Sequence, residues 1–561
     1  MKKILLGAAI LVLLVQFGFQ IYMAKSDSQT SDEGVHLLAG YTYLTKHDYR
    51  FNPEHPPLVK VLAATPLLFL KLNTAEVDYY WEKSGDFLYD SWQENRTAAE
   101  KFLYSSGNNA DQILFYARMP IVFLTLLLGL LIFAIAYRFW GPYGALVSTA
   151  LYAFDPNIMA HGHLVTTDIG ISIGFLLALS CGWLFLKNPS RRNILILGLG
   201  LGIAMLMKFT AIMLYPILIV LLTWHLFSVK ADWVKVKRYI ISFIGVILFS
   251  WLIIWAGYGF KSTLAPSATN VTQVAKNLNK PDAILPITQD QTTIADKAYG
   301  AIRYVMIPRE YFKGLFMVLT HVDNGHDSFL LGQFSKTGWW YYFPVVFSAK
   351  TTIPALLLIL AGIYYVIKSK DKRNAYFLVG ALLYFAFAMT SKANLGLRHV
   401  LPVYPILYIL AGILVVQKIK WFKIAIPILL VLIFAEFLAV KPFYLSYYNQ
   451  FYGGMWNGYK VATDSNLDWG QDVKRIAEYL DRNPEINKPF VEYGWNGQDS
   501  LDYYNIDRSD FATNYIVIGA SAIQSVTELN NKNYQYLKGI KYFDRITPSV
   551  FVYSLNQFDL R

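Results

Sequence analysis

Two adjacent acidic residues, Asp32 and Glu33, come shortly after the first apolar segment of the chain. A carboxylate at a membrane surface costs solvation energy unless it meets water or a cationic partner. One interpretation is structural: Ser31 caps a helix, and the two acids interact favourably with the helix dipole. The other is chemical, because a carboxylate in this position can act as a general base that takes the proton from an acceptor hydroxyl.

A proline-rich segment follows and places charged residues at the start of a predicted helix. His55 precedes Pro56 and Pro57, and Lys60 lies about one turn inside that helix. The segment can simply be a proline-capped helix at the membrane interface. Alternatively, the helix N-terminus and its nearby lysine are suited to binding a phosphate group.

Two histidines and an aspartate lie close together further along the chain. His161, His163 and Asp168 carry side chains that several divalent metal ions accept as ligands. The rival interpretation is that Asp168 begins the next helix as a second acidic residue facing a cleft, whose walls the histidines form. We expect no cofactor and no bound metal, and a divalent ion stays open as the alternative.

These residues lie between long apolar segments. Of the 561 residues, 55% are hydrophobic and 16% are charged, which is not the composition of a soluble enzyme. The single cysteine, Cys181, excludes an internal disulfide framework and a cysteine-based zinc site. Apolar stretches of roughly 18 to 25 residues are typical of transmembrane helices. The chain has about eleven such stretches. They cover residues 4–21, 119–137, 143–158, 169–186, 193–209, 211–228, 239–258, 343–367, 375–390, 397–416 and 422–440.

Short clusters of basic residues predict the orientation. They lie at residues 2–3, 187–192, 230–238, 368–373 and 418–423. Even numbers of segments separate them, so all of them are cytoplasmic if Met1 is. The net charge of +12 is therefore scattered and forms no basic stripe, and we expect no nucleic-acid partner. We expect an integral protein of the cytoplasmic membrane that has its active site on the outer side. Its first segment is expected to stay as an anchor, with a cleaved signal peptide as the alternative.

The sequence thus predicts a polytopic α-helical membrane protein with a small α/β domain at its C-terminal end. Residues 1–440 would form the multi-span domain, with external loops 22–118 and 259–342, and residues 441–561 the external domain. Within the tail we expect a helix at 471–480. Strands are expected at 490–493, 515–519, 536–543 and 549–555.

The segment from Asp464 to Gln471 superficially resembles the start of a calcium-binding loop. It lacks the glycine at the turn and the glutamate at the twelfth position that such loops require. We expect it to cap and dock against the external loops.

On this topology Arg118, Lys208 and Arg398 lie at the outer ends of their segments, where basic residues are less common. Each needs a partner, which can be a lipid headgroup, an acidic side chain or a bound phosphate. Arginine is the better phosphate ligand because its planar group binds two oxygens at once. We regard all three as candidate phosphate-binding residues, with headgroup anchoring as the alternative.

Taken together, these motifs resemble the protein O-mannosyltransferase family and its bacterial relatives, which include the aminoarabinose transferases. The later motifs are similar to a branch of phospholipid-carrier-dependent glycosyltransferases. The resemblance covers most of the chain, and its strength lies in the order and placement of the motifs. The matching motifs are Asp32-Glu33, His55-Pro56-Pro57-Leu58 with Lys60, Thr167-Asp168, Gly325 to Gly332, Gly338 to Pro344, Arg398 to Pro402, and Asp464 to Gln471.

The resemblance implies a membrane enzyme with the GT-C fold and gives roles to several residues. Asp32 would be the base, Glu33 its acidic partner and Asp168 the second acidic residue of the cleft. His55 would line the cleft, and His326 in the Gly325 motif is a further cleft candidate. The chain lacks the β-trefoil insert of many eukaryotic members and has His55 where the aminoarabinose branch usually has lysine, so the acceptor and the sugar stay open.

The implied reaction is direct displacement at the anomeric carbon of a polyprenyl-phosphate sugar. Asp32 would deprotonate an acceptor hydroxyl while the polyprenyl phosphate leaves, which inverts the anomeric centre. The expected partners are the lipid-linked sugar, a protein, lipid or glycan acceptor, and the bilayer. The alternatives are a lipid-linked oligosaccharide ligase or polymerase and, less well supported, a secondary transporter, which would place its ionisable groups near the membrane midplane.

Overall fold

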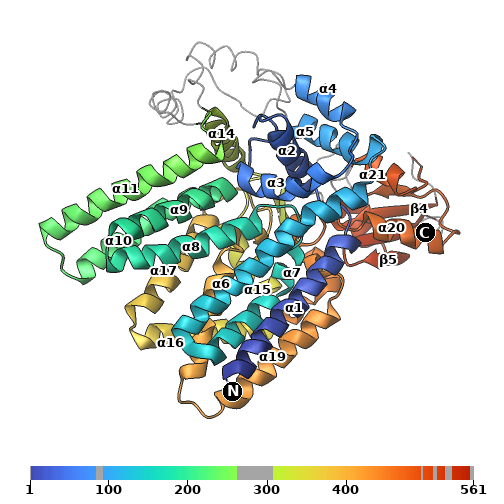
Figure 1. The fold of residues 1–561 in the computed structure, drawn as a ribbon. Coiled ribbons are helices and arrows are strands. Elements are labelled where there is room, and N and C mark those ends of the chain that lie inside the picture. Colours follow the sequence, from blue (N-terminus) through green and yellow to red (C-terminus); the bar gives the residue numbers. More distant parts are fainter. Residues whose placement is uncertain are drawn as a thin grey trace.

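The computed structural model describes residues 2–83, 92–261, 308–493, 497–509, 514–524 and 534–555. Long helices form a bundle, and a small sheet lies beside one end of it (Figure 1). By length and composition, six helices in the described ranges can cross a membrane, or seven if one bent pair is a single span. The six are α1 (Lys2–Ser26), α6 (Ala110–Ala153), α8 (Asp168–Lys187), α10 (Leu214–Ser228) with the preceding η3 (Phe209–Met213), α11 (Trp233–Gly257) and α19 (Phe422–Ala439).

Every predicted apolar segment contains a helix, so the fold class is confirmed. Segment 119–137 and most of segment 143–158 fall in α6, which is kinked at Gly141, where φ is 75° and only glycine fits easily. Segment 343–367 forms α15 (Tyr342–Lys350) and α16 (Ile353–Ser369), which meet at 117°. The other segments contain α9 (Arg191–Met207), α17 (Lys372–Met389) and α18 (Val403–Ala411). The total of about eleven transmembrane helices stays a prediction.

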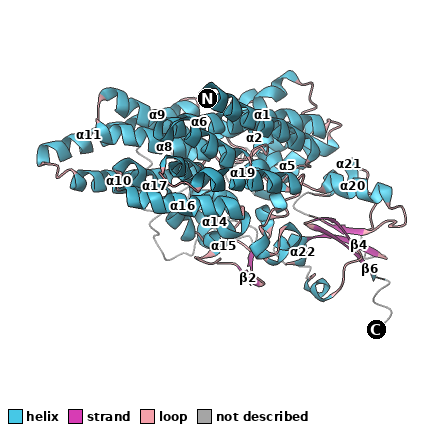
Figure 2. Cartoon of the chain, turned by 90° about the horizontal axis from the view of Figure 1, so that it is seen from below, coloured by secondary structure: helices cyan, strands magenta, loops and turns pink. Residues whose placement is uncertain are grey.

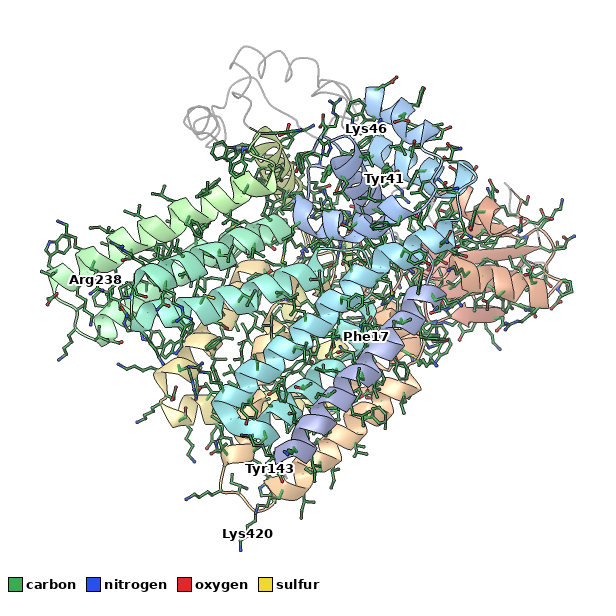
Figure 3. All side chains as sticks on the ribbon, viewed as in Figure 1. Phe17, Tyr41, Lys46, Tyr143, Arg238 and Lys420 are labelled. Atoms are coloured by element: carbon green, nitrogen blue, oxygen red, sulfur yellow. The ribbon has the colours of Figure 1, made fainter. Side chains whose placement is uncertain are left out.

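Shorter helices gather at the end of the bundle away from the N-terminus (Figure 1). They are α2 (Glu33–Thr45), α3 (Pro57–Ala64), α4 (Ala75–Lys83), α5 (Trp92–Glu100) and α14 (Arg309–Asn324). Figure 3 shows Arg238 and Lys420, from two of the basic clusters, at helix ends remote from Tyr41 and Lys46. These two basic clusters therefore lie away from the end of the bundle that carries the short helices. Residues 262–307 belong to the second predicted external loop and include Pro266, Pro281 and Pro286. They lie outside the described residues.

The C-terminal region contains a four-stranded sheet in the order β3-β4-β6-β5, at the side of the helices (Figure 2). Its strands are β3 (Phe490–Glu492), β4 (Tyr515–Gly519), β5 (Asp544–Thr547) and β6 (Val550–Ser554). Strands β3 and β4 are parallel, and the other pairs are antiparallel. Helices α20 (Val473–Arg482), α21 (Gln498–Tyr503) and α22 (Ala520–Ile523) complete the region.

Side chains alternate across this sheet and build two apolar clusters. Ile516 and Ile518 of β4 join the cluster that also contains Ala349 of α15, whereas Val517 joins the cluster with Ile476 of α20. One face of the sheet therefore packs against the helical bundle. The division of the chain at residue 440 stays a prediction.

One predicted strand is wrong. Residues 535–539 form the short helix η10 (Gln535–Gly539), and the strand begins later, at Asp544. Tyr534 and Leu537 both enter the same apolar cluster, at a spacing of three residues. That spacing suits a helical turn and not the alternation of a strand.

Candidate active site

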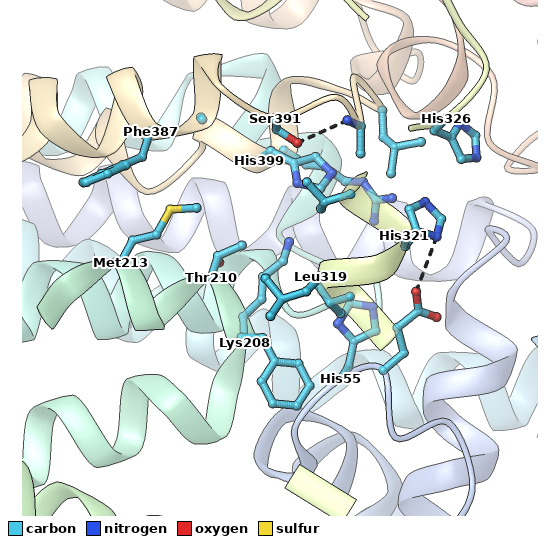
Figure 4. Close-up of a pocket in the computed structure, with 18 of the residues that line it drawn as sticks. His55, Lys208, Thr210, Met213, Leu319, His321, His326, Phe387, Ser391 and His399 are labelled. Atoms are coloured by element: carbon cyan, nitrogen blue, oxygen red, sulfur yellow. Dashed lines mark hydrogen bonds and ion pairs between the residues drawn. The ribbon is translucent and has the colours of Figure 1, made fainter. Parts of the chain in front are cut away.

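A cavity of about 470 Å³ lies between the short helices, the end of α17 with the residues that follow it, and the C-terminal segment. One part of its wall is polar and contains Asp32, Glu54, His55, Lys208, His321, His326, Arg398, His399, Asp464 and Trp469. Another part is apolar and contains Phe209, Ile212, Met213, Leu315, Val318, Leu319, Phe387 and Ala388. In Figure 4, Met213 and Phe387 lie on one side of Lys208, and His321 and His326 on the other. The cavity therefore joins a charged compartment to a hydrophobic one.

Asp32 is the N-cap residue of α2 and forms an ion pair with Arg398. The Arg398 Nη1 atom lies 2.7 Å from Asp32 Oδ2, although the two residues are far apart in the sequence. Arg398 belongs to the short helix η4 (Leu397–Val400), and its Nε atom is buried without a hydrogen-bond partner among the described residues. The arginine thus holds the carboxylate with one nitrogen, while its Nε atom has no hydrogen-bond partner among the described residues.

Glu33 points away from the cavity, which corrects its predicted catalytic role. Its carboxylate is fully buried and bound at two points by Arg118, with distances of 2.8 Å from Nε and 2.6 Å from Nη2. It also accepts hydrogen bonds from the backbone N–H groups of Thr30 and Val165. A carboxylate with all of these partners is a structural group, because taking up a proton would break the arrangement.

Arg118 is also a correction, since it was expected to bind phosphate. Besides Glu33, its Nη1 and Nη2 atoms donate to the backbone carbonyls of Ala24, Asp27 and Ser28 at 2.7–2.9 Å. All of its nitrogen atoms are engaged, and its side chain is fully buried. Arg118 therefore anchors the segment that leads from α1 to Asp32.

Lys208 reaches the cavity, and Asp168 supports it from behind. The Lys208 Nζ atom lies 2.6 Å from Asp168 Oδ1. Asp168, at the start of α8, is fully buried, and its Oδ2 atom has no hydrogen-bond partner in the described parts of the chain. The second acidic residue of the predicted cleft thus acts on the cavity through a lysine.

Lys60 does not reach the cavity, which corrects its predicted role in phosphate binding. It is fully buried, and its ammonium group donates to the carbonyl oxygens of Asn52 and His55 and to the Tyr43 hydroxyl. These contacts fix the loop that carries Glu54 and His55 onto α3. Lys60 is therefore a structural residue of that loop.

The two histidines near Asp168 do not assemble a metal site with it. His163 Nε2 lies 3.0 Å from Asp27 Oδ2, and its Nδ1 is 3.2 Å from the Met159 carbonyl. The His161 ring packs edge-on against Trp469, with 6.2 Å between the ring centres. The described ranges contain no group of three or more metal-binding side chains. Both histidines are buried behind the cavity wall, so the structure does not place them in the cleft.

Glu54 is a cavity residue that sequence reasoning missed. Burial and, next, the negative charge of Asp32 raise the pKa of Glu54 to about 7. His321 of α14 lies opposite, with 3.8 Å between its Nδ1 atom and Glu54 Oε1. The neighbouring His55 is held neutral, because burial lowers its pKa well below the usual value. Glu54 adjoins the His55 motif that was singled out, so its position in that motif was the available signal.

His399, Asp464 and Trp469 also line the cavity without having been predicted as site residues. Each one lies in a motif that the sequence does show, because His399 follows Arg398 and the other two belong to the Asp464 to Gln471 segment. His321 lies in no motif. That segment does dock against the loop that was predicted to be external, since Ser31 N–H donates to the Trp469 carbonyl at 3.0 Å.

Residues 109–255 match the model of the dolichyl-phosphate-mannose-protein mannosyltransferase family. The predicted family resemblance is confirmed for this part of the chain. It contains Asp168 and Lys208 from the site described above. No curated protein sequence matches the chain.

Two solved structures of other proteins are distantly similar. ArnT from Cupriavidus metallidurans bound to undecaprenyl phosphate is 12% identical, with 97% of each chain covered and a TM-score of 0.49. The oligosaccharyltransferase AglB from Archaeoglobus fulgidus, in complex with an inhibitory peptide and a dolichol-phosphate, is 10% identical. That match covers 92% of this chain and 71% of AglB, with a TM-score of 0.44. At this distance, the roles of individual residues have to come from contacts within this chain.

Proposed function

We propose that this protein is a membrane glycosyltransferase that moves a sugar from a polyprenyl-phosphate donor to an acceptor hydroxyl. The observation that carries the proposal is the cavity itself, where Asp32, Arg398 and Lys208 lie next to an apolar wall. Such a donor has the same two parts, a phosphate group and a hydrocarbon chain. The match of residues 109–255 to a mannosyltransferase family supports the same function.

In the proposed reaction Asp32 is the general base. Its carboxylate takes the proton of the acceptor hydroxyl, and the acceptor oxygen forms a bond to the anomeric carbon. The bond between that carbon and the phosphate oxygen breaks, and polyprenyl phosphate leaves with the electron pair. A single displacement of this kind inverts the anomeric centre.

Arg398 and Lys208 would stabilise the leaving phosphate. Both line the cavity, and each is already held in place by a carboxylate, Asp32 and Asp168 respectively. Fixed cations stabilise the charge that develops on the phosphate oxygen without having to reorganise during the reaction. The apolar wall around Met213, Leu319 and Phe387 would hold the first isoprene units.

We place the site on the outer side of the membrane. The short helices and the C-terminal segment contribute to the cavity wall, whereas Arg238 and Lys420, from two of the basic clusters, lie remote from the short helices (Figure 3). Cytoplasmic ends of membrane proteins carry the excess of Lys and Arg. On this basis residues 1–440 form the membrane domain and residues 441–561 an external domain that contributes one wall of the site.

Transfer measurements with purified protein and radiolabelled polyprenyl-phosphate hexoses test the proposal. Wild type would be compared with Asp32→Asn and with Asp323→Asn, an exposed aspartate of α14 that pairs with Lys392 and serves as control. We expect Asp32→Asn to lower the rate about 100-fold or more and the control to keep it. Equal activity of Asp32→Asn would remove the base assignment.

The released carrier separates this function from a ligase. A single sugar in the product together with polyprenyl monophosphate supports the transferase. A transferred oligosaccharide with a diphosphate carrier would instead show a ligase or polymerase. Following the label into protein, lipid and glycan fractions identifies the class of acceptor.

A further inference from the structure

Trp469 is an aromatic residue of the cavity wall that contacts one of its charged residues. The Arg398 guanidinium lies over its indole ring, with 4.2 Å to the ring centre. The same guanidinium binds Asp32, so the indole, the guanidinium and the carboxylate form one chain of contacts. Trp469 is only 2% exposed, and a desolvated arginine over a tryptophan face is among the stronger cation–π arrangements.

The backbone on both sides of Trp469 is held against the loop that carries Asp32. Ser31 N–H donates to the Trp469 carbonyl, and Ser28 N–H donates to the Gln471 carbonyl, both at 3.0 Å. The Trp469 N–H in turn donates to the Gln471 side chain at 2.8 Å. These bonds fix the position of the indole relative to α2 and leave its ring little freedom to move.

A second set of charged contacts locks this arrangement. Arg475 of α20 lies 2.6 Å from Asp27 Oδ1, and Asp27 Oδ2 meets His163. Lys474 N–H donates to the Ser28 hydroxyl at 2.8 Å. The C-terminal segment therefore holds residues 27–31, directly before Asp32, through several contacts.

We propose that Trp469 is a positioning residue, which holds the Arg398 guanidinium so that one nitrogen binds Asp32 and the others face the donor phosphate. Arg398 has no other aromatic contact in the described residues, and its Nε atom has no protein partner there. Without the indole face, the guanidinium can turn away from the phosphate position. The inference builds on the proposed function and adds to it that the C-terminal region completes the catalytic centre.

Three substitutions test this role. Trp469→Phe keeps an aromatic face, and Trp469→Leu keeps an apolar side chain without one. Trp456→Leu is the matched control, because the Trp456 ring also lies against an arginine, Arg545 at 5.1 Å, outside the cavity wall. The measurements are KM and kcat for the lipid-linked donor, inhibition by sugar-free polyprenyl phosphate, and thermal unfolding in detergent.

We expect Trp469→Leu to raise the donor KM and the inhibition constant of polyprenyl phosphate about tenfold. Trp469→Phe should stay within about threefold of wild type, because phenylalanine retains a face for the guanidinium. Trp456→Leu should leave both constants unchanged. A lower melting temperature for Trp469→Leu with unchanged constants would show a purely structural role and overturn the inference, as would equal losses in the Phe and Leu variants.

The test also separates this inference from the proposed function. If wild type transfers no sugar from any donor, the proposed function fails. The inference is then tested by binding alone. Binding of polyprenyl phosphate is measured as the rise in melting temperature that it causes. A rise in wild type and Trp469→Phe that Trp469→Leu loses supports the role of the indole, and the same rise in all three, or in none, refutes it.

Discussion

Glu33 and Arg118 form a two-point ion pair that is completely buried between α2 and α6. The neighbouring Asp32 instead faces the cavity and is bound by Arg398. Adjacent residues at a helix start point in different directions, because successive side chains are turned by about 100°. Two consecutive acids thus have different functions, one in the chemistry and the other in holding the loop.

Replacing Glu33 should affect stability more than chemistry. In Glu33→Gln the buried Arg118 loses its counter-charge, which costs about 3–5 kcal/mol. We expect a markedly lower melting temperature in detergent, and a donor KM close to wild type for the protein that remains folded. The double variant Glu33→Gln/Arg118→Gln should recover part of the stability. A Glu33→Gln protein that melts like wild type but transfers no sugar would contradict this and return Glu33 to the chemistry.

Replacing Lys208 should affect both stability and donor binding. Lys208→Met leaves the buried Asp168 carboxylate without its partner and should destabilise the protein by about 3–5 kcal/mol. The double variant Lys208→Met/Asp168→Asn removes both charges and should restore much of the melting temperature. Because the phosphate ligand is still absent, we expect its donor KM to stay raised about tenfold or more. A double variant with the wild-type KM would show that Lys208 serves only to neutralise Asp168.

Glu54 predicts a pH dependence of donor binding. Burial raises its pKa from the ordinary 4.5 to about 7, so the side chain is neutral below that pH and charged above it. A negative charge in the cavity repels the donor phosphate. We therefore expect kcat/KM for the donor to fall as the pH rises through about 7, and Glu54→Gln to flatten this limb. A limb that rises with pH and disappears in Glu54→Gln would instead show that the ionised form of Glu54 promotes the reaction.

The same shift affects stability. Between pH 4.5 and about 7 the folded protein keeps a proton on Glu54 that the unfolded chain has lost. The contribution of Glu54 to the free energy of unfolding is therefore fully present below pH 4.5 and is lost as the pH rises through about 7. We therefore expect the melting temperature of wild type to fall relative to that of Glu54→Gln as the pH rises across this interval.

Lys60→Met should disturb the loop that carries Glu54 and His55. The ammonium group binds the carbonyl oxygens of Asn52 and His55, which lose these partners in the variant. We expect a lower melting temperature together with reduced transfer, whereas Lys46→Met, an exposed lysine paired with Asp78, should change neither. A Lys60→Met protein with normal stability but a raised donor KM would restore the phosphate-binding interpretation.

Much of this structure could be predicted from the order of apolar and polar segments. The helices follow from long apolar runs, and Asp32, His55, Lys208, His326 and Arg398 all reach one cavity. The length of an apolar segment strongly constrains where a helix lies, because the membrane tolerates few backbone groups without hydrogen bonds. The strand expected at 536–543 was wrong because a short apolar pattern fits a turn of helix as well as it fits a strand.

Which charged residues reach the cavity and which are buried in pairs could not be predicted. Arg118 and Arg398 look alike in the sequence, as basic residues at the outer ends of apolar segments. Only the tertiary structure shows that Glu33 occupies Arg118 and that Arg398 retains an unpaired nitrogen. His321 likewise reaches the cavity because α14 lies over it, a placement that no local pattern encodes.

Asp464 and Trp469 emerge from the ribosome only after all the helices that line the cavity have been synthesised. Membrane insertion therefore first produces a protein with Asp32 in place and one wall of the cavity missing. N-terminal parts of a chain generally fold before the later parts exist. The segment around Trp469 can then dock against residues 27–32 only after the helices are in place, and a chain whose translation stops before Asp464 would lack one wall of the cavity.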